Sequence, residues 1–83
     1  MSYLLICRSL TFAQRTLKRI EKAGIAGSIV KAPQALLEEG CGYSVRVAET
    51  RYRRAMEALK GSELMPKRVF LQYADGHYAE VKG

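Results

Sequence analysis

The sequence predicts an α+β fold of the ferredoxin-like, split βαβ type (βαββαβ), and three observations support this prediction. Short apolar segments and two amphipathic helical segments follow one another in the order strand, helix, strand, strand, helix, strand. A further strand follows the Asp75–Gly76 pair, so we expect a C-terminal hairpin. The 83 residues suit one domain, 1–83. Together these features predict an antiparallel sheet with two helices on one face.

The first strand and the first helix have clear patterns. Residues 3–7, YLLIC, form a short apolar run typical of a buried strand. Within 9–24, apolar residues recur at helical spacing at Leu10, Ala13, Leu17 and Ile20. Thr11 followed by Gln14 has the form of a capping box, and Gly24 stands where a C-terminal cap belongs. We therefore predict a helix between these two signals.

The next segments predict two strands joined by a connection. Residues 26–33 form a strand that closes at Pro33, and 34–40 are long enough for a single helical turn. Residues 42–49 alternate cleanly, with one face made of Tyr43, Val45 and Val47 and the other of Ser44 and Arg46. This alternation predicts a strand with one buried face.

The second helix and the hairpin complete the chain. The helix is expected from about Thr50 to Gly61, with an apolar stripe formed by Tyr52, Ala55, Met56 and Leu59. Within 67–81, the Asp75–Gly76 pair predicts a two-residue type I′ turn. Because two helices cover one face only, the other, half-apolar face predicts a homodimer through that face or through a sheet edge.

Composition indicates a soluble globular chain. Apolar residues make up 48% and charged residues 27%, and no apolar run approaches the roughly 20 residues that span a bilayer. We read no signal peptide at the start, and with two cysteines the expected location is the cytoplasm. The net charge of +6 admits an acidic partner such as nucleic acid, but its spread along the chain favours solvated helix surfaces.

Cys41 is the first candidate for chemistry, because Gly40 and Gly42 flank it and leave the thiol uncovered. Backbone amides at such a turn can stabilise a thiolate, and Arg46 or Lys31 can add positive charge, with Arg46 as the first candidate for an electrostatic helper. Glu38 and Glu39 act in the opposite direction. The alternative is that Cys41 is a small apolar residue in a tight turn.

The second cysteine and the histidine are weaker candidates for a reactive or metal-binding site. Cys7 lies in an apolar strand and is expected in the core. Taking the first and third strands as parallel neighbours puts Cys7 some 15 to 20 Å from Cys41 (about 3.3 Å per residue), which predicts no disulfide. With one histidine, His77, no zinc-ligand spacing is present, so we expect no metal and no cofactor.

RNA binding is a second possible function of the predicted sheet. Tyr3 and Tyr43 are placed on strands that in ferredoxin-like sheets can stack bases, but the RNA-recognition motif of such sheets is missing. The basic stretch RYRR, 51–54, predicts a solvated helix face, with Tyr52 toward the core.

The stretch CRSLTFAQRTLKRIEKAGIAGSIVKAPQALLEEGCGYSVRV resembles a family of small bacterial Se/S carrier protein-like domains. The matching positions are Ser9, Ala13, Gly24, Ile25, Pro33, Cys41 and Gly42. The resemblance implies that Cys41 carries a persulfide or selenosulfide between a cysteine desulfurase-type donor, or a sulfur-carrier protein, and an acceptor. Such a carrier is not an enzyme in its own right.

Two other functions stay open at this point. One is a small basic nucleic-acid-binding module driven by the net positive charge, whose binding weakens steeply with salt. The other is a protein-interaction module that uses the uncovered sheet face. The sequence names neither the donor nor the acceptor, and it does not separate sulfur from selenium.

Overall fold

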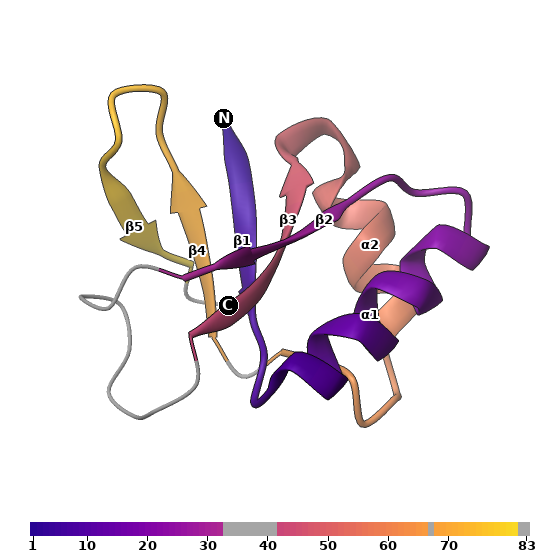
Figure 1. Cartoon of the computed structure of the whole chain (residues 1–83). Helices are drawn as coiled ribbons and strands as arrows, with labels where there is room; N and C mark the ends of the chain where they lie inside the picture. Colours follow the sequence, from indigo (N-terminus) through magenta and orange to yellow (C-terminus); the bar gives the residue numbers. More distant parts are fainter. Residues whose placement is uncertain (33–41, 67, 82–83) are drawn as a thin grey trace.

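The strands form a single antiparallel sheet in the computed structural model, which describes residues 1–32, 42–66 and 68–81 (Figure 1). The elements are β1 (Ser2–Ile6), α1 (Leu10–Lys22), β2 (Ser28–Lys31), β3 (Tyr43–Ala48), the 3-10 turn η2 (Glu49–Arg51), α2 (Tyr52–Leu59), β4 (Arg68–Gln72) and β5 (Tyr78–Glu80). The strand order is β2-β3-β1-β4-β5. Because β3 separates β1 from β2, the α+β, split βαβ prediction is confirmed. The predicted helical turn at 34–40 lies outside the described residues.

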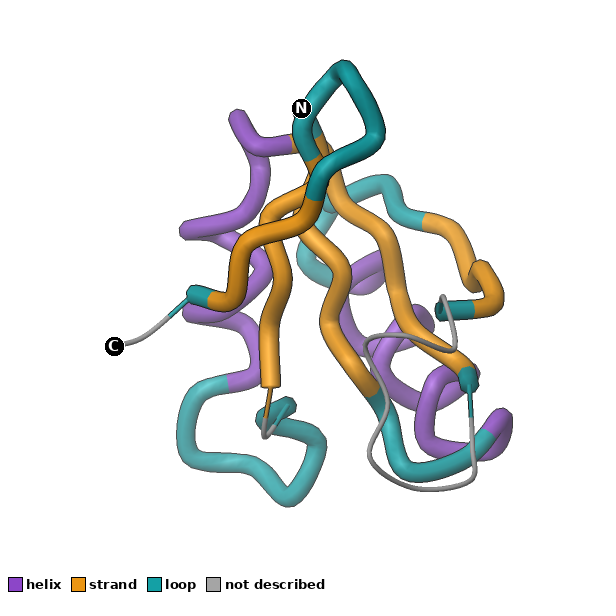
Figure 2. The backbone as a smooth tube through the Cα atoms, turned by 90° about the vertical axis from the view of Figure 1, so that its left-hand side faces the viewer, coloured by secondary structure: helices purple, strands orange, loops and turns teal. Residues whose placement is uncertain are grey.

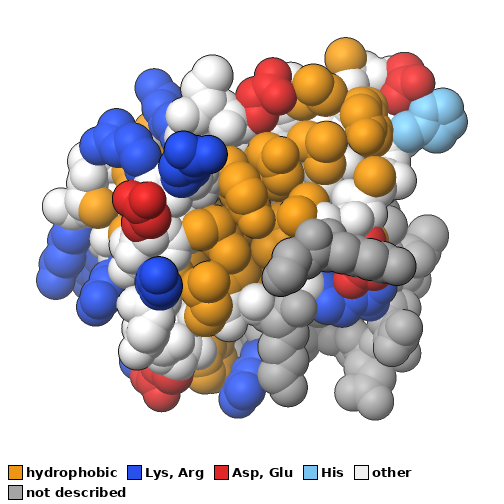
Figure 3. All heavy atoms as spheres, turned by 180° about the vertical axis from the view of Figure 1, so that it is seen from behind, with side chains coloured by type: hydrophobic (Ala, Val, Ile, Leu, Met, Phe, Trp, Pro, Cys, Tyr) orange, Lys and Arg blue, Asp and Glu red, His pale blue; other side chains and the backbone are white. Residues whose placement is uncertain are grey.

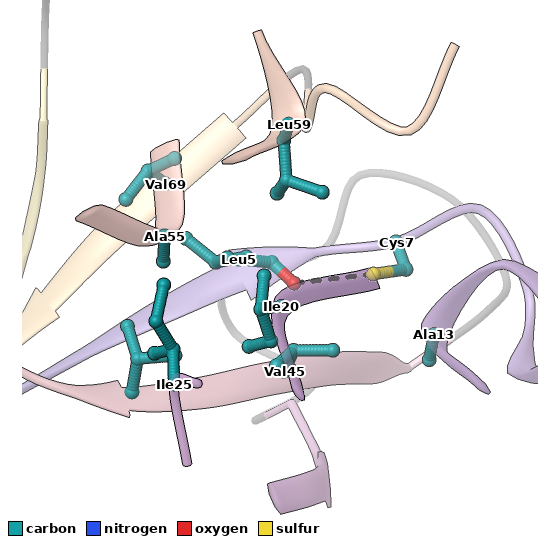
Figure 4. Packing of buried hydrophobic residues seen from close by; sticks show 10 residues of the cluster. Leu5, Cys7, Ala13, Ile20, Ile25, Val45, Ala55, Leu59 and Val69 are labelled. Carbon is teal, nitrogen blue, oxygen red and sulfur yellow. Dashed lines mark hydrogen bonds between the residues drawn. The ribbon is translucent and has the colours of Figure 1, made fainter. Parts of the chain in front are cut away.

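The sheet is strongly twisted, and both helices lie on one face of it. In Figure 1, β2 runs almost across the view while β1 and β4 run almost vertically, and Figure 2 shows the same twist from the side. Leu5 of β1 is paired with Val45 of β3 and with Val69 of β4, so these three side chains form one row on the helix side. Helix residues close over this row at Ile20, Ala55 and Leu59 (Figure 4). This contact between sheet and helices is the centre of the core.

Helix α1 begins earlier than the predicted capping box requires. Ser9 is extended (φ −158°, ψ 170°), and its hydroxyl accepts a hydrogen bond from the Phe12 amide at 3.2 Å. The prediction of Thr11 and Gln14 as the capping pair is therefore wrong, because Ser9 already satisfies a free amide of the first turn. The predicted end is confirmed: Gly24 has φ +80°, and the Ile25 amide donates to the Ile20 carbonyl as in a Schellman motif.

Helix α2 is shorter than predicted. The chain leaves β3 through η2, so the regular helix starts at Tyr52 instead of about Thr50 and ends at Leu59. Gly61, with φ +78°, follows the end of the helix as expected. The predicted faces of β3 are confirmed, since Val45 and Val47 are buried on the helix side while Arg46 is exposed on the other. That other face is not exposed throughout, because Ser44 is fully buried on it and its hydroxyl donates to the Val30 carbonyl at 3.2 Å.

The β4–β5 hairpin is confirmed, but its turn type differs. Gly76 has φ +94°, whereas no described non-glycine residue has a positive φ, so Asp75 does not adopt the type I′ conformation. The Tyr73 amide donates to the His77 carbonyl at 2.8 Å and the Gly76 amide donates to the Tyr73 carbonyl at 3.0 Å. These bonds fit a three-residue loop with glycine in the left-handed region. The type I′ prediction failed because an Asp-Gly pair also suits this longer loop.

Gly27, just before β2, lies where the backbone passes close to α1 and β3. A Cβ atom there would stand 3.1 Å from Cδ1 of Ile20 and 3.2 Å from the carbonyl oxygen of Arg46. The second neighbour is backbone and has little room to move, so a larger side chain has to push strand and helix apart.

We expect Gly27→Val to lower the free energy of unfolding by about 1–3 kcal/mol, because it overpacks this contact. Urea denaturation followed by circular dichroism measures the change. The exposed neighbour Ala26 provides the control, and Ala26→Val should change the value by no more than about 0.5 kcal/mol. Equal stability of the two variants would contradict the close approach at Gly27.

Candidate functional site

Of the predicted carrier motif, Gly40–Cys41–Gly42, the structure describes only Gly42, which lies at one end of the sheet. Cys41 and Gly40 fall outside the described residues, and Gly42 is the residue directly before β3. The Ala32 amide donates to the Gly42 carbonyl, and Lys31, the last residue of β2, pairs with Tyr43. The connection that carries Cys41 therefore leaves and rejoins the sheet at this one end.

The same end of the sheet holds the start of α1. The Cys7 amide donates to the Tyr43 carbonyl at 3.0 Å, and Arg8 and Ser9 then lead into the helix. The first turn of α1 has no acidic residue, so the partial positive charge of the helix N-terminus is not neutralised there. Arg8, an exposed cation, lies over the Phe12 ring at 5.3 Å. These groups give the described part of this end a positive character, which favours an anion such as a thiolate.

Of the two cations considered as electrostatic helpers, Lys31 lies closer to this end than Arg46. Lys31 is exposed and stands opposite Tyr43, the first residue of β3. Arg46 is exposed on the sheet face away from the helices and lies three positions after Tyr43, about 10 Å along the strand. The helper role of Arg46 stays a prediction. The preference for Arg46 over Lys31 overlooked the antiparallel pairing of the two strands, which places the end of β2 beside the start of β3.

Cys7 is a core residue, as predicted. Its side chain is 9% exposed, and its thiol donates to the Leu5 carbonyl at 3.4 Å (Figure 4). Burial raises the pKa of the Cys7 thiol above its ordinary value, while hydrogen bonds with the Thr16 side chain and the Val45 backbone oppose that rise. Cys7 is therefore a protonated, packed thiol at neutral pH and a poor nucleophile.

The premise that excluded a Cys7–Cys41 disulfide is wrong. β1 and β3 are antiparallel, not parallel, and their pairing ends with Ile6 opposite Ser44. Cys7 thus lies next to Tyr43, two residues along the chain from Cys41, so the estimate of ~15 to 20 Å does not hold. The prediction of no disulfide loses this support, and Cys41 itself lies outside the described residues.

The tyrosines considered for RNA stacking do not lie on the sheet face away from the helices. Tyr3 is on the helix side and stacks on Tyr52 of α2, with ring centroids 3.8 Å apart and an angle of 15° between the planes. Tyr43 is half-buried and packs against the core from the same side. Tyr3 and Tyr43 thus lie on the central strands β1 and β3, as considered, but the strand alternation turns both toward the helices, so they do not form an exposed platform for bases.

His77 lies in the β4–β5 loop. Its ring Nδ1 is 2.7 Å from a carboxylate oxygen of Asp75, and its amide donates to the other oxygen at 3.0 Å. These hydrogen bonds lower the pKa of Asp75. Within 1–32, 42–66 and 68–81, no cluster of three or more His, Cys, Asp or Glu side chains is arranged to hold a metal ion. None of the helices in these ranges has the length and apolar character needed to cross a membrane.

The burial of Cys7 can be tested by alkylation. In a Cys41→Ser variant, we expect iodoacetamide at neutral pH to modify native Cys7 at least about tenfold more slowly than the denatured chain, because the thiol is covered and protonated. Since the folded pKa is raised, the unfolded thiol ionises first, so stability is lost as the pH rises above the ordinary thiol value. Mass spectrometry at several pH values follows the reaction, and equal rates in both states would contradict the packing.

Comparison with protein families identifies the family of this chain. Residues 2–71 match the family described as "Putative Se/S carrier protein-like", which covers most of the 83-residue chain. No curated protein matches the chain, and no solved structure does. The chain therefore belongs to the Se/S carrier protein-like family.

Proposed function

We propose that the protein carries sulfur or selenium as a persulfide or selenosulfide on Cys41 and performs no turnover of its own. Membership of the Se/S carrier protein-like family is the observation that carries this proposal. The donor would be a cysteine desulfurase-type enzyme or a sulfur-carrier protein, and the acceptor would be a further thiol.

The burial of Cys7 supports Cys41 as the carrying residue. The chain has two cysteines, and Cys7 is packed among core residues with a raised pKa. A carrier thiol has to reach a donor, ionise and remain open to the next thiol. Cys7 meets none of these requirements in the folded state, which leaves Cys41.

The chemistry needs a thiolate at the moment of transfer. The Cys41 thiolate attacks the outer sulfur of the donor persulfide, a new S–S bond forms, and the donor leaves as a thiolate. The donor's S–S bond breaks as the new one forms and the proton stays on the transferred sulfur, so the oxidation level is unchanged and no external oxidant or reductant is required. Lys31 and the N-terminus of α1, at the end of the sheet where the connection attaches, supply positive charge that favours the ionised form.

Loading by a donor tests the proposal directly. After incubation with a cysteine desulfurase and cysteine, intact-mass spectrometry should show the gain of one sulfur atom, about 32 Da. The gain should disappear in Cys41→Ser and persist in Cys7→Ala. A wild-type protein that gains no sulfur, or a gain that depends on Cys7 instead, would overturn the assignment.

The two candidate helpers can be separated by charge reversal. We expect Lys31→Glu to slow alkylation of Cys41 about twofold to fivefold at neutral pH, because a nearby negative charge raises the thiol pKa. Arg46→Glu makes the same change of charge at a site further along β3, so it should have a smaller effect. Rates against pH in a Cys7→Ala background measure both. The opposite order would restore Arg46 as the helper.

A further inference from the structure

We propose that the sheet surface beside α2 binds an acidic amphipathic helix of a partner protein. This surface, called the β4–β5 surface below, is formed by Tyr3, Tyr52, Met56, Leu71 and Ala79. All five side chains are half-buried in the isolated chain. The proposal does not depend on thiol chemistry and stands apart from the proposed function.

The floor of the β4–β5 surface is a row of apolar side chains across three strands. Tyr3 of β1 pairs with Leu71 of β4, and Leu71 pairs with Ala79 of β5. These residues share the helix side of the sheet with Leu5 and Val69, but the helices cover only the latter pair fully. Strands lie about 4.8 Å apart, so the row is roughly 10 Å wide, which is about the width of one helix.

Helix α2 forms one wall of the β4–β5 surface. On its α1 side, the Ala58 carbonyl accepts a hydrogen bond from Nε of Arg19 at 3.2 Å. At about 100° per residue, the opposite flank of α2 presents Tyr52 and Met56. Beyond them lie exposed charged residues, the cations Arg53 and Lys60 with the carboxylate of Glu57 between them. A helix placed on the β4–β5 surface would therefore lie parallel or antiparallel to α2 with these cations along its side.

The space-filling view agrees with this description. Figure 3 shows hydrophobic side chains gathered in one broad field between α2 and β5; the margin nearest α2 carries mainly Lys and Arg side chains, with acidic side chains among them and along another margin. Met1, just before β1, is 53% exposed, and Tyr73, just after β4, is 40% exposed. An apolar field of this extent on so small a chain is typical of an interaction site.

The positive charge beside the β4–β5 surface favours an acidic partner over a second copy of the chain. Arg53 and Lys60 are exposed, and neither forms an ion pair with another described residue. A second copy of the chain would bring the same cations and the same net charge of +6 to the interface. An acidic helix with one apolar stripe instead fits both the floor and the charged wall.

A synthetic peptide can test the occupant. The probe is a helical peptide of about 18 residues with Leu at i, i+3, i+4 and i+7 and Glu elsewhere, added to the full ¹⁵N-labelled chain. We expect saturable binding with amide shifts at Leu71, Ala79 and Tyr3. A scrambled peptide and a Lys-for-Glu peptide should bind at least about tenfold more weakly. Equal binding of the three peptides, or none by the Glu peptide, would overturn the proposal.

Charge-reversal variants of the protein provide the matched control. Arg53→Glu with Lys60→Glu should weaken binding of the Glu peptide at least about tenfold, whereas Lys18→Glu with Lys22→Glu on α1 should leave it within about twofold. All four positions are exposed, so we expect both variants to keep the fold. Sedimentation at several concentrations adds a separate outcome: a stable dimer whose contact excludes the peptide would assign the β4–β5 surface to a second copy and overturn the proposal.

Discussion

The pairing of β3 between β1 and β2 is the constraint on which the rest of the structure depends. It puts Leu5 beside Val45 on the helix side, where Ile20 and Leu59 close over them. Side chains alternate along a strand, so a shift of one residue in this register would send the buried row to the opposite face. The apolar row thus fixes the position of every neighbouring residue, including those with reactive or charged side chains.

The same register separates the two cysteines by environment. Cys7 follows β1 on the helix side and is sealed into the core, whereas the connection that contains Cys41 joins the sheet at Lys31 and Gly42. A thiol locked in the core adds apolar packing, and its raised pKa protects it from oxidation and from unwanted exchange. A carrier with one reactive thiol benefits from this division, because a second accessible thiol near the first could discharge the persulfide as a disulfide.

Periodicity in the sequence was sufficient for the elements and for which residues share a face, since the repeat of side-chain direction is a local property of helices and strands. It did not predict that Leu4, Ser44 and Phe70 are buried on the sheet face away from the helices. It did not determine the helix cap or the turn type, where neighbouring residues compete for the same role. Ser9 displaced Thr11 as the helix cap, and Gly76 alone took the positive φ that a type I′ turn requires of two residues. The direction of the first strand relative to the third was the more consequential error, because it hid how near Cys7 lies to Tyr43. Such relations are set by topology across the chain and leave no mark in local spacing.

The hairpin appended to the split βαβ unit explains why an apolar surface remains beside α2. Two helices about 10 Å wide suit a four-stranded sheet, and α1 already packs over β2 and β3. Adding β5 therefore widens the sheet without adding a helix to cover it, and Leu71 and Ala79 are left only half-buried. Tyr3 of this surface lies near the start of β1, whereas Cys7 follows the other end of that strand, four positions or about 13 Å away. A partner helix could thus bind through the β4–β5 surface while the thiol-bearing connection stays open to exchange, so recognition and sulfur transfer need not compete for one site.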